Sequence, residues 1–142
     1  MTKKTILSST KEVEVRFSEV DSMGILWHGS YVKYLEDGRE DFGKKYNLGY
    51  LDTLAEGFFV PLIQLNMDFK KPLVYGDKAI VKTTFINAEA AKILYQYEIR
   101  NAKDNTIVLK GDSIQVFLDK DYQLVWSTPE FFIDWKKKWK LI

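Results

Sequence analysis

Residues 28–45, HGSYVKYLEDGREDFGKK, contain the pattern that decides the fold. Every third or fourth residue is apolar or small, which is the spacing of an amphipathic helix. The stripe consists of Tyr31, Leu35, Gly38 and Phe42, with Tyr34 beside it. A glycine in a helix interior costs about 1 kcal/mol relative to alanine. We therefore expect a buried helix, with Gly38 at a close approach to another backbone.

Most of the remaining chain alternates between apolar and polar residues, which is typical of half-buried strands. The clearest example is residues 63–69, in which Ile63, Leu65, Met67 and Phe69 share one face. Four more strands are expected at residues 11–20, 78–87, 92–100 and 106–118. Short turns join the later strands, so the chain is predicted to be an α+β domain whose curved antiparallel sheet wraps around the helix.

Smaller features refine this prediction. Phe17 alternates with Val13 and Val15, so it is expected on the buried face of the first strand. Gly111, inside a strand, indicates a bulge or a close contact. Near the end of the chain a short strand is expected at residues 124–126, followed by a helix with Thr128 as its N-cap and Pro129 at its first position.

Composition excludes several classes of function. The 142 residues include 21 basic and 20 acidic side chains, for a net charge of +1, so a nucleic-acid partner is not expected. Cysteine is absent and His28 is the one histidine, which excludes disulfides, cysteine nucleophiles and three-histidine metal sites. No metal or other cofactor is expected. No apolar run approaches ~20 residues, so we expect one domain over 1–142, soluble, cytoplasmic and without membrane insertion.

The loop before the helix carries the strongest candidate for catalysis. Asp21 lies between a strand end and a helix start, where free N–H groups carry partial positive charge. Such groups can hold an oxyanion, and a nearby carboxylate can act as nucleophile or general base. From the residues alone, an aspartate in a strand-to-helix loop is usually a turn or capping residue. His28 could present its backbone N–H or its ring to a carbonyl, or be a partly buried, satisfied histidine.

Two lysine runs are candidate contacts for phosphate. Lys70 and Lys71 lie at a strand end before Pro72. The run in WKKKWK, residues 135–140, could touch phosphate or a membrane surface, or form the solvated face of a terminal helix. We retain Lys70 and Lys71 as the candidates for substrate binding.

Residues 15–39, VRFSEVDSMGILWHGSYVKYLEDGR, resemble the 4-hydroxybenzoyl-CoA thioesterase family of hotdog-fold acyl-CoA thioesterases. The shared pattern is an aromatic strand end, an acid two residues before an aspartate, and a glycine three residues after it. A hydrophobic pair follows, and then an aromatic residue, histidine or tyrosine, two small residues and tyrosine. These positions are Phe17, Glu19, Asp21, Gly24, Ile25, Leu26, Trp27, His28, Gly29, Ser30 and Tyr31. A looser likeness continues through MDFKKP, residues 67–72, and YGD, residues 75–77.

The resemblance implies a hotdog fold, with five antiparallel strands around a central helix. It also implies a homodimer that pairs two sheets edge to edge with active sites at the subunit interface, and often a homotetramer. Asp21 would be the catalytic carboxylate, attacking directly or activating water, and the N–H groups near His28 would polarise the thioester carbonyl. Substrate-binding positions would be Gly24, Trp27, Gly29 and Tyr31.

Some alternatives stay open at this point. His28-Gly29-Ser30 also resembles the block of a second hotdog branch, whose acid lies on the helix nine residues after the histidine; that position is Asp37, preceded by Glu36. The spacing between Asp21 and His28 argues against a hotdog hydratase. The function predicted is acyl-CoA hydrolysis, with acyl-carrier-protein hydrolysis or acyl-thioester binding without catalysis as alternatives.

Overall fold

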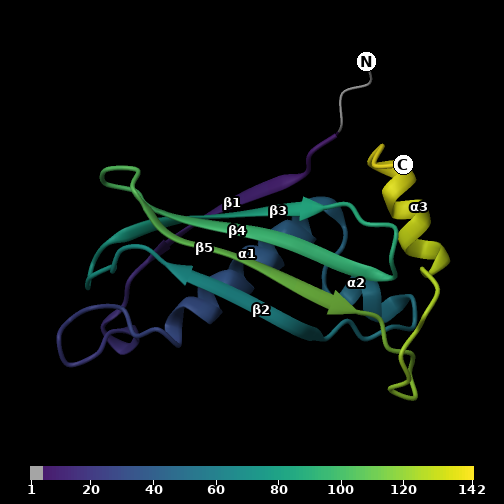
Figure 1. The fold of residues 1–142 in the computed structure, drawn as a ribbon, viewed down its shortest axis with the longest axis horizontal. Helices are drawn as coiled ribbons and strands as arrows, with labels where there is room; N and C mark the ends of the chain where they lie inside the picture. The colour runs from purple at the N-terminus through teal and green to yellow at the C-terminus, as the bar shows by residue number, and fades with distance from the viewer. Residues whose placement is uncertain (1–4) are drawn as a thin grey trace.

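A five-stranded antiparallel sheet curves around one long helix in the computed structural model, which describes residues 5–142 (Figure 1). The strands lie in the order β1-β3-β4-β5-β2, so β1 and β2 are the sheet edges. The strands are β1 (Ser8–Glu14), β2 (Leu62–Phe69), β3 (Lys78–Ile86), β4 (Lys92–Asn101) and β5 (Ile107–Val116). The helices are α1 (Ser30–Tyr46), α2 (Tyr50–Ala55) and α3 (Glu130–Lys138), with a 3₁₀ turn, η1, at Phe17–Glu19. The predicted α+β class and wrapped helix are confirmed.

The predicted stripe of α1 faces the sheet and is buried along its length. Gly38 lies where the helix crosses β3. A Cβ atom there would come within 2.6 Å of Thr83 Oγ1 and 2.9 Å of Val81 Cγ1. The close approach is therefore confirmed, but the neighbours are side chains of a strand and not backbone.

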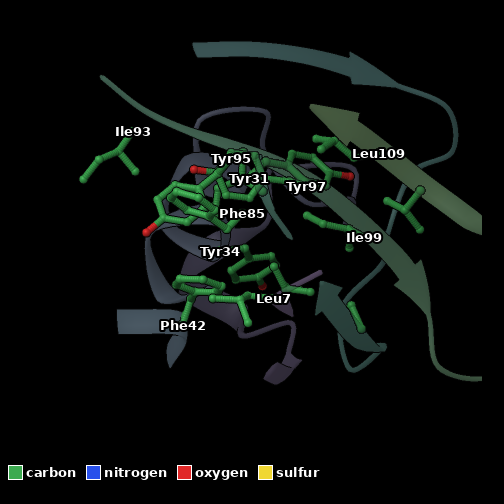
Figure 2. Close-up of a cluster of buried hydrophobic side chains, with 14 of the residues drawn as sticks. Leu7, Tyr31, Tyr34, Phe42, Phe85, Ile93, Tyr95, Tyr97, Ile99 and Leu109 are labelled. Carbon is green, nitrogen blue, oxygen red and sulfur yellow. The ribbon is translucent and has the colours of Figure 1, made fainter. Parts of the chain in front are cut away.

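The core lies between α1 and the inner faces of β3 and β4 (Figure 2). Alternate residues of both strands point inward, as the two-residue period requires. Aromatic rings fill much of the space: Phe42 lies 5.1 Å from Tyr95 and 6.2 Å from Phe85, measured between ring centroids. The alternation predicted for residues 92–100 is confirmed, because Ile93, Tyr95, Tyr97 and Ile99 are all buried.

Three details at strand and helix ends differ from prediction. β1 stops at Glu14 and the chain turns into η1, so Phe17 is 80% exposed and not on the buried face. The strand expected at residues 124–126 is only an isolated bridge between Leu118 and Leu124. Pro129 is the N-cap of α3, not its first helical residue, and Thr128 caps nothing.

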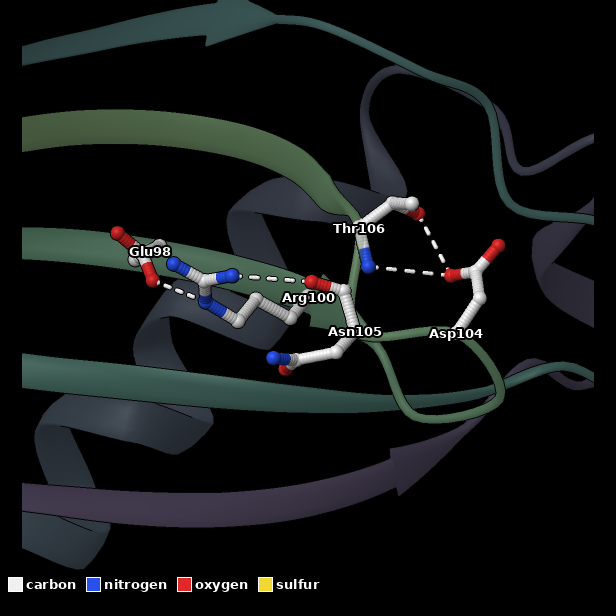
Figure 3. Close-up of polar contacts among 5 residues, drawn as sticks. All are labelled: Glu98, Arg100, Asp104, Asn105 and Thr106. Carbon is white, nitrogen blue, oxygen red and sulfur yellow. Dashed lines mark hydrogen bonds and ion pairs between the residues drawn. The ribbon is translucent and has the colours of Figure 1, made fainter.

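Two features of the sheet match the sequence pattern. At Gly111 a Cβ atom would lie 2.6 Å from the Asn66 carbonyl oxygen, so the predicted close contact is with β2. The turn between β4 and β5 is held from β4 and from within (Figure 3). Arg100 of β4 donates to the Asn105 carbonyl over 2.9 Å and also pairs with Glu98, and the Thr106 N–H donates to Asp104 Oδ1 over 3.1 Å. No helix in the described part of the chain is long and apolar enough to cross a bilayer.

Candidate functional site

The segment between η1 and α1 forms a small hairpin that folds back on the helix start. Val20 pairs with Leu26, and the Asp21 N–H donates to the Ile25 carbonyl over 2.9 Å. The hairpin base is closed by the Glu19 carbonyl, which accepts from the Trp27 N–H at 3.0 Å and the Ser30 hydroxyl at 3.0 Å. These bonds hold the Asp21 loop beside the first turn of α1.

Asp21 is half-buried at the first position of the hairpin turn. Its Oδ1 accepts from the Met23 N–H over 2.8 Å, so Asp21 does cap a turn. Its Oδ2 has no hydrogen-bond partner within residues 5–142. Gly24 follows at φ +77°, a conformation that glycine adopts without steric cost, and completes the turn. One carboxylate oxygen therefore holds the turn, and the other has no partner in the described chain.

The start of α1 has open donors. Gly29 is the N-cap and provides no side-chain cap, and the N–H groups of His28 and Gly29 have no acceptor among the residues that the structure describes. His28 is exposed, so the expectation of a partly buried histidine is wrong. The Trp27 ring lies against Gly29, where a Cβ atom would approach it to 2.1 Å. A larger residue at position 29 would displace this indole.

The second block of the family pattern lies beside this hairpin, at the same end of the molecule (Figure 1). The Leu26 N–H donates to the Leu73 carbonyl at 2.8 Å, and Ile25 pairs with Val74. The Tyr75 N–H donates to the Gly24 carbonyl at 3.0 Å. Residues 17–31 and 67–77, far apart in sequence, therefore make one surface.

Tyr31, Lys70 and Lys71 are placed differently from the loop residues. Tyr31 is buried, and its ring lies 5.2 Å from that of Phe69, which joins the helix start to the end of β2. Lys70 and Lys71 are exposed just beyond Phe69, and the Lys70 ammonium lies 2.6 Å from Asp68. The two lysines are therefore at the loop end of the molecule, with Lys70 in a solvent-exposed ion pair.

Several large apolar side chains are exposed around the hairpin. We call this set the loop-end patch. Exposed apolar patches mark interfaces or ligand sites in soluble proteins. The patch consists of Phe17, Met23, Trp27, Phe69, Val74 and Tyr75, each at least 45% exposed.

The helix acids Glu36 and Asp37 face a groove of ≈ 1050 Å³ between β1 and α1. The groove reaches the loop-end patch, because Phe17 and Tyr75 also line it. Burial, with the nearby charge of Glu40, raises the pKa of Asp37 above its ordinary value. A second cleft of ≈ 730 Å³ separates α1 and α2 from β4 and β5. Among the described residues no three His, Cys, Asp or Glu side chains are grouped to hold a metal ion.

Residues 15–135 match the family model of the thioesterase-like superfamily. The chain belongs to this superfamily. It is 34% identical over 127 residues to the putative acyl-CoA thioesterase YneP of Bacillus subtilis strain 168, which covers 89% of this chain and 91% of that relative. Both the match and the fold extend across the hairpin and the helix start.

Solved structures agree with this membership. DHNA-CoA thioesterase from Staphylococcus aureus superposes with a TM-score of 0.83 at 29% identity, over 94% of this chain and 89% of that one. 4-Hydroxybenzoyl-CoA thioesterase from Pseudomonas sp. strain CBS-3 shares the fold, with a TM-score of 0.78 at 21% identity over 90% and 98% of the two chains. The predicted hotdog fold and family resemblance are confirmed, and this superfamily member is a thioester hydrolase.

Sequence reasoning missed one residue of the thioesterase's loop end. Tyr34 was grouped with the core stripe, yet its hydroxyl donates to Glu19 Oε1 over 2.8 Å. The signal was available, because a buried tyrosine hydroxyl usually finds a hydrogen-bond partner. The partner could not be named, since Glu19 lies outside the helix.

Proposed function

We propose that this thioesterase hydrolyses acyl-CoA thioesters to a free acid and CoA at the hairpin that carries Asp21. The main support is the closure of the hairpin base by the Glu19 carbonyl. This closure holds the Asp21 carboxylate, one oxygen of which has no partner in the described chain, beside the open N–H groups at the helix start. The loop-end patch surrounds this point and offers apolar surface for an acyl or pantetheine group.

In this proposal Asp21 supplies the carboxylate and the N–H groups near His28 supply the oxyanion site. Water attacks the thioester carbon as Asp21 takes its proton, or Asp21 itself attacks and water then releases the acid. The carbonyl oxygen gains negative charge, which the positive end of α1 stabilises. The C–S bond breaks, and CoA leaves as a thiolate that takes up a proton.

The remaining candidates take binding roles. Gly24 and Gly29 let backbone approach the thioester, and Lys70 and Lys71 contact CoA phosphates. Trp27 forms an apolar wall, and the buried Tyr31 supports the binding surface from below through its contact with Phe69. The exposure of Ile63 and Phe69 on edge strand β2 favours pairing with a second copy, because open sheet edges recruit partners. We therefore propose a homodimer or homotetramer. Light scattering that shows only monomer at micromolar concentration contradicts the assembly.

The decisive experiment is a free-thiol assay on a panel of acyl groups, each as a CoA and as a carrier-protein thioester, in excess chelator. Turnover of CoA thioesters without a metal is expected, since neither Asp21 nor an N–H group needs one. Faster turnover of carrier-protein thioesters would show that the acyl group is carried by the carrier protein and not by CoA. Acyl-CoA binding without any turnover would show a binding protein and refute the proposal, and a metal requirement would refute the role of Asp21.

A further inference from the structure

Glu19 joins the Asp21 hairpin to α1 through both its side chain and its backbone. Its Oε1 accepts from the Tyr34 hydroxyl at 2.8 Å and from the Arg16 N–H at 2.9 Å. Its carbonyl accepts from the Trp27 N–H and the Ser30 hydroxyl, each at 3.0 Å. The oxygens of Glu19 thus accept four hydrogen bonds, two residues before Asp21.

The Tyr34 end of this connection is rigid. Tyr34 is 2% exposed and belongs to the buried stripe of α1, so its ring cannot move without disturbing the core. Burial, and then the hydrogen bond and charge of Glu19, raise the pKa of Tyr34 well above its ordinary value. The phenol therefore stays protonated and remains a donor across the working pH range.

We propose that Glu19 is a positioning residue, which uses Tyr34 and Ser30 to fix the Asp21 hairpin against the open N–H groups of α1. This inference rests on the proposed function, because its consequence is a rate. Misplacing a reacting group by about 1 Å can cost on the order of 10²-fold in rate. Glu19 acts in this account as a hydrogen-bond acceptor, and its charge and its proton affinity take no part in the reaction.

The chain offers a matched pair of variants. Tyr34→Phe removes a hydroxyl that donates over 2.8 Å to Glu19, and Tyr46→Phe removes one that donates over 2.8 Å to the Ser8 carbonyl at the other end of α1. We expect Tyr34→Phe to lower kcat about 10-fold and to keep KM within about two-fold of wild type. This pattern is expected when a reacting group is misplaced in the transition state while substrate binding is retained. Tyr46→Phe should leave kcat unchanged, although its melting temperature should fall by about as much as that of Tyr34→Phe. Equal kcat values for the two variants overturn the proposal.

Amide hydrogen exchange tests the connection without relying on activity. In Tyr34→Phe the N–H groups of Asp21 and Trp27, bonded across the hairpin, should exchange at least about five-fold faster than in wild type. In Tyr46→Phe they should be unchanged. Unaltered exchange in Tyr34→Phe overturns the positioning role. A wild-type protein that hydrolyses no acyl thioester refutes the proposed function instead, and the exchange result still stands on its own.

Two substitutions of Glu19 separate positioning from direct participation. Glu19→Gln keeps an oxygen that can accept both donors, so kcat should stay within about three-fold of wild type. Glu19→Ala removes the acceptor and should lower kcat at least as much as Tyr34→Phe. If Glu19→Gln is as damaging as Asp21→Asn, Glu19 is itself the reacting carboxylate and the positioning proposal is wrong.

Discussion

The two ends of α1 are completed in opposite ways. At the carboxyl end the Tyr46 carbonyl accepts from the indole N–H of Trp135 at 2.7 Å and of Trp139 at 3.1 Å. Asn47 then leaves the helix at φ 60°, with its N–H donating to the Gly43 carbonyl. At the amino end, the His28 and Gly29 N–H groups have no acceptor in the described chain. A closed helix end serves the fold, whereas an open amino end is available to negative charge.

Some aromatic contacts show the same contrast. Near the carboxyl end of α1, Trp135 packs 5.0 Å from Phe85 and 5.7 Å from Phe132, within the core. Near the amino end Phe17 and Tyr75 contact each other edge to face, yet both are exposed. Phe17 and Tyr75 belong to the loop-end patch, which the proposed function uses as a binding surface. Exposure alone does not separate the two ends, because Tyr50, just beyond the carboxyl end of α1, is also exposed. Four predictions test this contrast between the carboxyl end of α1, which packs in the core, and the amino end, which carries the proposed site.

Trp135→Ala should have the largest effect, and the effect should be on stability. The substitution empties the aromatic cluster and removes one of the two donors to Tyr46, so we expect a loss of about 3–5 kcal/mol in the free energy of unfolding. Denaturant unfolding measures it. Acyl-CoA turnover at a temperature where the variant is folded should be unchanged. A lower kcat in the folded variant would show that the two ends are coupled.

Asp21→Asn should come next and act only on rate. We expect kcat to fall at least ~10²-fold, the low end for acid–base catalysis, with the fold and acyl-CoA binding retained. Glu36→Gln and Asp37→Asn should each cost less. Each variant needs a melting temperature within a few degrees of wild type. An inactive Asp37→Asn beside an active Asp21→Asn would move the site to the helix acid.

Gly38→Ala tests the middle of the helix, between the two ends. Alanine favours the helix by about 1 kcal/mol, but its Cβ would overlap Thr83 Oγ1 and Val81 Cγ1. Overpacking of this kind costs about 1–3 kcal/mol, so we expect a net loss of stability in calorimetry. A more stable variant would show that β3 yields at this point and that the glycine is not required by packing.

Lys70→Ala and Lys71→Ala should have the smallest effects. Both lysines are exposed, and exposed ion pairs contribute about 0–1 kcal/mol, so KM for acyl-CoA should rise by no more than about five-fold. The rise should shrink at high salt. Lys82→Ala, an exposed lysine on β3, is the matched control. Equal KM values for all three variants would remove the lysines from the site.

Periodic features were predictable because their signal lies in residues a few positions apart. The α1 stripe and the alternation in β4 appear in the structure close to their predicted ranges. β2 also lies where it was predicted, but its apolar face is buried only in part, because Ile63 and Phe69 are exposed and the pairing with β5 shifts register between Leu62 and Gln64. The Asp21 block was also recognisable, since its residues are neighbours in sequence. Irregular segments were less accessible: Phe17 fits an alternating pattern, but the chain leaves the sheet at Glu14 and exposes it.

Local sequence pattern was therefore enough for the long helix, most strands and the residue types at the candidate site. The tertiary structure alone decided which of them meet. Tyr34 lies fifteen residues from Glu19, and Trp135 lies eighty-nine residues from the Tyr46 carbonyl that it caps. The physical reason is that periodic burial is set by local neighbours, whereas an unpaired donor or acceptor is satisfied by whatever the fold brings within 3 Å or so. At the carboxyl end of α1 the fold brings two indole donors to the Tyr46 carbonyl. At the amino end no described residue supplies an acceptor for the N–H groups of His28 and Gly29.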